Sequence, residues 1–307
     1  MSGRDRWLAA RRERITASDV AAILGEDPYR NALSVYAEKV GAVDVEPTDP
    51  MLWGLALEDG IGRRYAEVTG RPVVALAPYE MAQHPDIPWL SCTPDRWTEG
   101  TPECQAPEAG RGPLQIKAQG IGRAQLWREQ PPTTYLIQVQ IEMACTGAAW
   151  ASLAAFLGMG EPLAWTDIVR DDAFLGTAIP QLEAFLLRVQ RRDPPDATDG
   201  SSATFRALRS LYPLDNGETV DLTDEQARLV EAMESARAEE KRQREIADVN
   251  EARIRAEIAA ATFGALPDGS YLELRTVERK GYTATVKPTT YRSLKHKQPK
   301  IRGGRNR

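Results

Sequence analysis

The chain has few of the side chains on which many catalytic sites depend. Its 307 residues include only two histidines, His84 and His296, and three scattered cysteines, Cys92, Cys104 and Cys145. So few histidines argue against a His-based catalytic triad or zinc site. An odd number of dispersed cysteines argues against a disulfide framework or a four-cysteine cluster, and favours a reducing compartment. Any metal chemistry must therefore use carboxylates, which favours Mg²⁺ or Mn²⁺.

Long apolar runs are also missing. No stretch of eighteen apolar residues occurs, so we expect no membrane span. The first residues, "MSGRDRWLAARRER", are charged and unlike a secretory signal, so we expect a cytoplasmic protein. With 42% hydrophobic residues, the chain can still bury a sizeable core.

Positive charge is unevenly distributed along the chain. The net charge is −5, yet the segment from Tyr271 to Arg307 holds eleven Lys/Arg and two Asp/Glu, a net of +9. The first 270 residues therefore carry −14. This asymmetry fits a basic arm that touches a polyanion, and equally a solvated tail that only aids solubility.

Helical patterns come first and strand patterns follow. Helices are expected over "ITASDVAAILG", "ALSVYAEKVG" and "MLWGLALEDGIGRRYAEVTG", each closed by glycine. Strands are expected in "RPVVALAPYEM", "PWLSCTPDRW" and "GPLQIKA". They are followed by the helix "YLIQVQIEMACTG", the buried strand "AAWASLAAFLG" and the helix "DDAFLGTAIPQLEAFLLRVQRR". We predict an α/β (α+β) core with a mixed central sheet flanked by helices, and we place Trp53 and Trp150 inside it.

The last third of the chain has a different composition. We predict a core domain over 1–195, a linker over 196–222, an extension over 223–294 and a basic disordered tail over 295–307. The extension begins with a capping-box pattern at Thr223 and continues as a long charged helix. A β-hairpin turning near Lys280–Gly281 is expected to follow it.

One short strand carries an isolated lysine. In "GPLQIKAQG", Lys117 is the only lysine between Lys39 and Lys241. Gln115 and Lys117 project from one face because side chains alternate along a strand. Asp95, in "CTPDRW", could face this pair across a hairpin. A carboxylate-bound cation and a neighbouring lysine could then hydrolyse a phosphodiester, although a solvated strand face is the simpler interpretation.

Five ordered stretches resemble one family. They are "RRERITASDVAAILGEDPYRNALSVYAEKVG", "LWGLALEDGIGRRYAEVTG", "HPDIPWLSCTPDRW", "LQIKAQG" and "YLIQVQIEMACTGAAWASLAAF". Together they resemble the lambda exonuclease and YqaJ-like phage recombination exonucleases, a branch of the PD-(D/E)xK nucleases. The resemblance covers roughly residues 5–160. It implies a restriction-endonuclease-like core and a Mg²⁺- or Mn²⁺-dependent deoxyribonuclease.

The resemblance also implies roles for individual residues. Metal ligation would fall to Asp95, the residue at position 115, the carbonyl of Ile116 and, directly or through water, Glu58. Lys117 would activate the attacking water and Gln138 would lie over the site. Contacts to DNA and its 5′-phosphate would come from Arg11, Ser18 and Tyr135.

Each of these residues also has an ordinary structural interpretation. Glu58, followed by Asp59, could belong to a solvated helix face. Ser18 could act only as a helix cap, and Arg11 is one of several neighbouring arginines. Gln138 could be a polar position on an amphipathic helix.

At position 115 the chain departs from the family, which has glutamate there. Gln115 keeps the size of glutamate but removes one negative charge from a site that must attract a divalent cation. Three interpretations remain open: an engineered variant, a natural site that tolerates glutamine, or a site in which Glu142 substitutes. Glu142 lies one helical turn after Gln138, so both could reach the same site.

The resemblance implies an exonuclease that digests linear duplex DNA from 5′ to 3′ and exposes 3′ single strands for a single-strand annealing protein or recombinase. A phage or prophage origin would accompany that activity. An endonuclease or nickase on the same scaffold is an alternative. A catalytically inactive protein that binds DNA ends is another, and Gln115 is its best support. Some family members form ring-shaped trimers, which leaves a homo-oligomer open.

Overall fold

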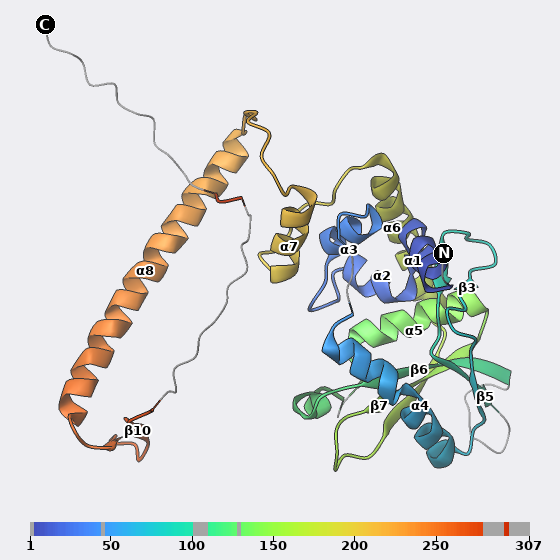
Figure 1. Cartoon of the computed structure of the whole chain (residues 1–307), viewed down its shortest axis with the longest axis horizontal. Coiled ribbons are helices and arrows are strands. Elements are labelled where there is room, and N and C mark those ends of the chain that lie inside the picture. Colours follow the sequence, from blue (N-terminus) through green and yellow to red (C-terminus); the bar gives the residue numbers. More distant parts are fainter. Residues whose placement is uncertain (1–2, 44–46, 101–109, 128–129, 279–291, 295–307) are drawn as a thin grey trace, which may run out of the picture. The chain divides into compact units, whose positions relative to one another are not determined.

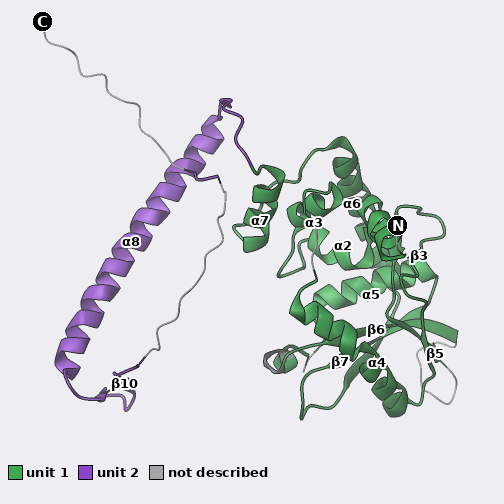
Figure 2. Ribbon diagram, in the orientation of Figure 1, with its two compact units in different colours: residues 1–213 green, residues 214–307 purple. Residues whose placement is uncertain are grey.

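The computed structural model describes residues 3–43, 47–100, 110–127, 130–278 and 292–294 (Figure 1). They fall into two compact units, residues 1–213 and residues 214–307 (Figure 2). The predicted basic tail over 295–307 and the predicted turn at Lys280–Gly281 lie outside the described residues.

Short helices form the N-terminal part of the first unit. They are α1 (Gly3–Glu13), α2 (Ala17–Ile23) and α3 (Ala32–Lys39), with the two-residue strand β1 (Ile15–Thr16) between α1 and α2. Thr16 precedes α2 as its cap and pairs with Asp19, which accepts hydrogen bonds from the Thr16 N–H and hydroxyl at 3.1 and 2.7 Å. The helices predicted over "ITASDVAAILG" and "ALSVYAEKVG" are confirmed, with Thr16 rather than Ser18 as the cap.

The third predicted helix is α4 (Asp49–Thr69), which ends at Gly70 in the left-handed conformation at φ 70°. Its buried residues, Ile61, Gly62 and Tyr65, all lie in the second half of the helix. Trp53 in the first half is 67% exposed, so its prediction as a core residue is wrong. The α4 residues that contact the sheet follow Trp53 in the chain.

A five-stranded mixed sheet forms the centre of the first unit. Its strand order is β2-β5-β6-β7-β8, and all neighbouring pairs are antiparallel except β6 and β7. The strands are β2 (Val73–Ala75), β5 (Arg96–Gly100), β6 (Gly110–Ala118), β7 (Trp150–Phe156) and β8 (Ala164–Val169). Trp150 is 1% exposed, which confirms its place in the core. A second small sheet joins β1 to β4 (Leu90–Cys92) and β3 (Ala82–Gln83).

The helix α5 (Thr133–Thr146) makes the crossover between the parallel strands β6 and β7, after the 3-10 turn η2 (Ile121–Trp127). One face of the sheet packs against α4, where Ile61 and Tyr65 meet Leu114 and Ile116. On the opposite face of the sheet, every second residue of β7 packs with Val139 and Met143 of α5. α5 lies between the sheet and α2 (Figure 1), and α6 (Asp172–Arg191) completes that core. The predicted mixed sheet flanked by helices is confirmed.

The first unit extends further along the chain than predicted. A helix, α7 (Ser202–Leu211), lies within the segment 196–222 that the composition assigned to a linker. Ala207 packs against Leu33 and Ala37 of α3, and the Asn31 amide donates to the Thr204 hydroxyl at 2.6 Å. A ten-residue helix is marginal by itself, and this one is stabilised by its contact with α3.

The second unit is a long helix followed by a short hairpin. Helix α8 (Asp224–Ile258) has no buried residue, as the charged composition predicted. The hairpin pairs β9 (Phe263–Ala265) with β10 (Tyr271–Glu273), and it precedes the predicted turn, which lies outside the described residues. Asp268 and Gly269 form the observed turn, in which Gly269 has φ 85° and Asp268 accepts from Ser270. Among the described residues, no helix combines the length and apolarity that crossing a membrane requires.

Candidate active site

Asp95 and Gln115 meet at the end of the strand pair β5–β6. In this register Arg96 lies opposite Leu114, so Asp95, one residue before β5, is level with Gln115. The Gln115 amide donates to Asp95 Oδ2 at 2.5 Å, and the Ile116 N–H donates to the same oxygen at 2.7 Å. Asp95 directly precedes the strand β5 and faces Gln115 across the strand pair, as the sequence predicted.

Lys117 lies two residues beyond Gln115 and contacts the helix α5. Its ammonium donates to Gln138 Oε1 at 3.0 Å, and the Gln138 amide donates to Glu142 Oε1 at 2.9 Å. Gln138 and Glu142 are one helical turn apart, so both side chains point from α5 toward the strand. The structure therefore brings Asp95, Lys117, Gln138 and Glu142 into one polar site.

Glu142 is fully buried beneath this site. Burial, followed by the nearby charge of Asp95, raises the pKa of Glu142 to about 8, so its carboxyl group is mostly protonated at neutral pH. Burial also raises the pKa of Asp95, while the Lys117 ammonium acts in the opposite direction. The site therefore holds less negative charge than its number of acids suggests.

Tyr135 is held beside the lysine. The Lys117 ammonium lies 4.8 Å from the centre of the Tyr135 ring, and the phenol accepts a hydrogen bond from the Gln119 amide at 2.8 Å. The ring also stacks on Trp127 at 5.8 Å. Tyr135 thus fixes one side of the lysine and contributes an aromatic surface next to it.

Glu58 reaches the site from α4, on the other side of the sheet from α5. Its carboxylate forms an ion pair with Arg96, and Arg96 also contacts Asp59 at 2.5 Å. Burial and the charge of Asp95 raise the pKa of Glu58, and Arg96 opposes them. Sequence reasoning assigned no role to Arg96, although it directly follows Asp95.

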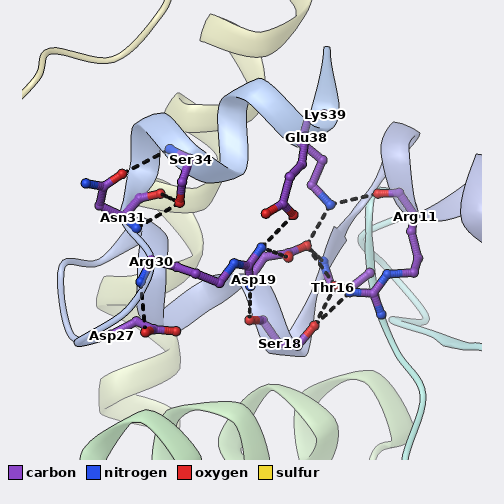
Figure 3. Close-up of polar contacts among 10 residues, drawn as sticks. All are labelled: Arg11, Thr16, Ser18, Asp19, Asp27, Arg30, Asn31, Ser34, Glu38 and Lys39. Carbon is purple, nitrogen blue, oxygen red and sulfur yellow. Dashed lines mark hydrogen bonds and ion pairs between the residues drawn. The ribbon is translucent and has the colours of Figure 1, made fainter. Parts of the chain in front are cut away.

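Arg11 and Ser18 form a second polar group, which Figure 3 shows. The Arg11 guanidinium donates to the Ser18 hydroxyl at 2.9 Å, and the Ser18 hydroxyl lies 3.2 Å from that of Thr16. Thr16 rather than Ser18 caps α2, and the half-buried Ser18 hydroxyl contacts both Arg11 and Thr16. The two residues predicted to contact a 5′-phosphate therefore lie together.

A buried ion cluster supports this pair (Figure 3). Asp19 accepts from Lys39 at 2.6 Å and from Arg30 at 3.1 Å, and Lys39 also donates to the Arg11 carbonyl at 2.7 Å. Burial alone would raise the pKa of Asp19, but Lys39, Arg30 and Arg11 hold it well below its usual range. Sequence reasoning missed this scaffold; the capping box of Thr16 and Asp19 was its only local signal.

Trp7 connects the second polar group to the first. Its indole N–H donates to the Thr93 hydroxyl at 3.2 Å, two residues before Asp95, and the Arg11 guanidinium lies 4.7 Å from the Trp7 ring centre. Arg11 is thus fixed relative to the loop that carries Asp95.

The side chains of this site are suited to one divalent cation, and they do not form a dense cluster of acids. No three His, Cys, Asp or Glu side chains of the described residues are grouped to hold a metal ion. However, Gln115 Oε1 and Glu142 Oε2 are buried with no hydrogen-bond partner in the described part of the chain. The unpaired Gln115 side-chain oxygen, beside the Asp95 carboxylate, is an acceptor suited to a hard cation. Asp95, Gln115 and the Ile116 carbonyl would hold it.

The fold and this site define the class of protein. An aspartate before one strand and a lysine near the end of its antiparallel neighbour, in a mixed sheet between helices, are the arrangement of PD-(D/E)xK nucleases. Residues 6–149 match the model of the family described as the YqaJ-like viral recombinase domain. The resemblance drawn from the five sequence motifs is confirmed.

Known relatives support the same assignment. The chain is 27% identical to the uncharacterized protein YqaJ of Bacillus subtilis over 227 residues, which are 72% of this chain and 67% of that protein. It is similar to LHK-Exo solved in complex with dAMP, at 25% identity and a TM-score of 0.50 over 62% of this chain and 94% of that one. A structure of the same alkaline exonuclease from Laribacter hongkongensis gives a TM-score of 0.49 at equal identity and coverage. The family match and the similarity to LHK-Exo at a TM-score of 0.50 support a nuclease role.

Proposed function

We propose that this chain is a Mg²⁺- or Mn²⁺-dependent exonuclease that digests one strand of linear duplex DNA from a phosphorylated 5′ end. The observation that carries the proposal is the connection of two polar groups. One holds Asp95 and Lys117, and the other pairs Arg11 with Ser18, with Trp7 and Thr93 between them. Cleavage from a DNA end requires that the residues binding the end are held at a fixed position relative to the residues that hydrolyse the phosphodiester.

A bound divalent cation would supply a water of lowered pKa and neutralise charge on the scissile phosphate. The chain's own residues orient the reaction. The Lys117 ammonium, held by Gln138 and Tyr135, is placed to hydrogen-bond the attacking water and the phosphate oxygens. Gln138 also donates to Glu142, so its amide links Lys117 to the next turn of α5.

Arg11 and Ser18 are the residues we assign to the terminal phosphate. A guanidinium and a hydroxyl that already touch each other offer several donors to phosphate oxygens. The buried Asp19 and Lys39, with the partly exposed Arg30, support this pair without a hydrogen bond to the Ser18 hydroxyl. Digestion from 5′ to 3′ in the bacterial cytoplasm would leave 3′ single strands for a single-strand annealing protein or recombinase.

The experiment that tests this function compares DNA topologies. The full chain is incubated with 5′-phosphorylated linear duplex and with covalently closed circular duplex, in Mg²⁺ or Mn²⁺ and with EDTA as control. The proposal predicts progressive, metal-dependent loss of one strand from linear DNA only. Nicking of the circle would favour the endonuclease or nickase alternative.

The inactive end-binding protein is a second candidate, and Gln115 is the observation that favours it. Its amide satisfies Asp95 without any cation, because the amide N–H donates to the carboxylate. An inactive chain would bind phosphorylated ends and cleave neither DNA.

A further inference from the structure

Arg96 places a permanent positive charge against the acidic residues of α4. Its Nη1 forms an ion pair with Glu58, and its Nη2 lies 2.5 Å from Asp59 Oδ1. The same Nη1 donates to the backbone carbonyl of Asp95 at 2.5 Å. The guanidinium therefore lies between the α4 acids and the backbone carbonyl of Asp95, just before β5.

The register of the sheet explains this position. Arg96 is directly opposite Leu114, and directly opposed residues project from the same face. Leu114 packs on α4, so Arg96 also points toward α4. Gln115, the next residue of β6, points to the opposite face, where its amide contacts Asp95. Glu58 and Asp95 thus approach the site from different faces, with Arg96 on the face of Glu58.

The ion pair of Arg96 and Glu58 is partly shielded from water. Their side chains are 15% and 18% exposed, so their attraction is screened less than that of a surface pair. A guanidinium stays protonated and offers several N–H donors in one plane, so it can bind two carboxylates at once. A divalent cation at Glu58 would have to displace Arg96 or bind close to its charge.

We propose that Arg96 is a resident cation that keeps divalent metal ions away from Glu58 and Asp59. The active site then holds one tightly bound divalent cation, on the side of Asp95 and Gln115, and Glu58 is a partner of Arg96 rather than a metal ligand. This inference rests on the proposed function, because it concerns the cation of that same site. It revises the role that the family resemblance implied for Glu58.

The test counts bound ions instead of measuring activity. Mn²⁺ is titrated into the full chain, and bound Mn²⁺ is followed by the loss of the free-ion EPR signal and by calorimetry. We expect one tight ion in the unsubstituted chain and two in Arg96→Gln. In Arg96→Lys, which keeps a positive charge, the count stays at one. Adding Glu58→Gln to Arg96→Gln returns the count to one.

Arg64→Gln is the matched control. Arg64 is on the same helix as Glu58, and its exposed guanidinium pairs with Glu67. Removing that charge should leave the count at one. Two tight ions in the unsubstituted chain would contradict the proposal without any variant, and so would a single ion in folded Arg96→Gln. Failure of the proposed function has a different signature, namely no cleavage of linear DNA whatever the number of bound ions.

Discussion

The Lys117 ammonium donates a hydrogen bond to the side-chain oxygen of Gln138 at 3.0 Å, which joins strand β6 to helix α5 inside the candidate active site. Tyr135 covers one side of this ammonium, and Glu142 holds Gln138 from the next turn of α5. The lysine is therefore held in one position before DNA arrives. A preorganised donor of this kind contributes to catalysis because it needs little reorganisation during the reaction.

Replacing this lysine should separate cleavage from binding. We expect Lys117→Met to slow metal-dependent cleavage of linear duplex DNA by about 10²–10⁴-fold, since it removes a positioned donor and charge. Binding of DNA ends should remain, because Arg11 and Ser18 are untouched. Single-turnover cleavage and a gel-shift assay measure the two properties. Lys241→Met, on the exposed helix α8, is the control and should cleave normally; normal cleavage by Lys117→Met would remove the lysine from the mechanism.

Glu142 should make the folded state less stable at alkaline pH. Its pKa is about 8 in the folded state and near 4.5 when exposed, so the folded chain binds more protons between these values. Stability therefore falls as pH rises from about 5 to 8, by at most about 1.4 kcal/mol per pH unit from this group. Glu142→Gln cannot ionise and should flatten that fall, as measured by urea unfolding at pH 5, 6.5 and 8.

The exposed carboxyl of Glu183 on α6 provides the matched comparison for this effect. Glu183→Gln should keep the pH profile of the unsubstituted chain. If Glu142→Gln and Glu183→Gln give the same profile, Glu142 does not titrate as a buried group.

Arg11 should determine the preference for phosphorylated ends. Losing a charge-assisted hydrogen bond to phosphate costs about 1.5–3 kcal/mol, so Arg11→Gln should reduce the preference for 5′-phosphate over 5′-hydroxyl ends by about 10–100-fold. Ser18→Ala should reduce it less. The neighbouring Arg12→Gln controls for the loss of charge in α1. A preference that survives in Arg11→Gln would place the end-binding site elsewhere.

The basic C-terminal residues should contribute to DNA affinity through charge. Ending the chain at Leu294 removes six Lys/Arg. If they contact phosphates, the slope of log K against log salt should become shallower by up to about 5, because each contact releases close to one counterion. Fluorescence anisotropy between 50 and 200 mM salt measures this slope. An unchanged slope and affinity would leave the segment without a role in DNA binding.

Local signals predicted much of the fold. Glycine stops such as Gly70 located helix ends, and the alternation around Lys117 located β6, because both depend on backbone preferences that a few residues encode. α7 was missed, since this short helix buries its apolar residues only against α3. The hairpin of β9 and β10 was not predicted, because alternation alone does not identify which turn closes a hairpin.

The candidate site was predicted less completely. Strand alternation could group Gln115 and Lys117 with Asp95. The family resemblance placed Gln138 over them, and helix periodicity added Glu142 beside Gln138. The pairing of Arg96 with Glu58 depends on the register between β5 and β6 and on the packing of α4, which no local pattern specifies. The same holds for the pairing of Asp19 with Lys39, twenty residues apart.

Gln115 offers the most direct test of the account. We compare Mg²⁺-dependent cleavage of 5′-phosphorylated linear duplex DNA by the unsubstituted chain, Gln115→Glu and Gln181→Glu, in which the same change is made on the exposed part of α6. One added carboxylate next to Asp95 should strengthen cation binding, so Gln115→Glu should cleave at least about tenfold faster, equivalent to about 1.4 kcal/mol. Gln181→Glu should match the unsubstituted chain. No cleavage by either the unsubstituted chain or Gln115→Glu, at any concentration of Mg²⁺ or Mn²⁺, would contradict a metal-dependent nuclease at this site.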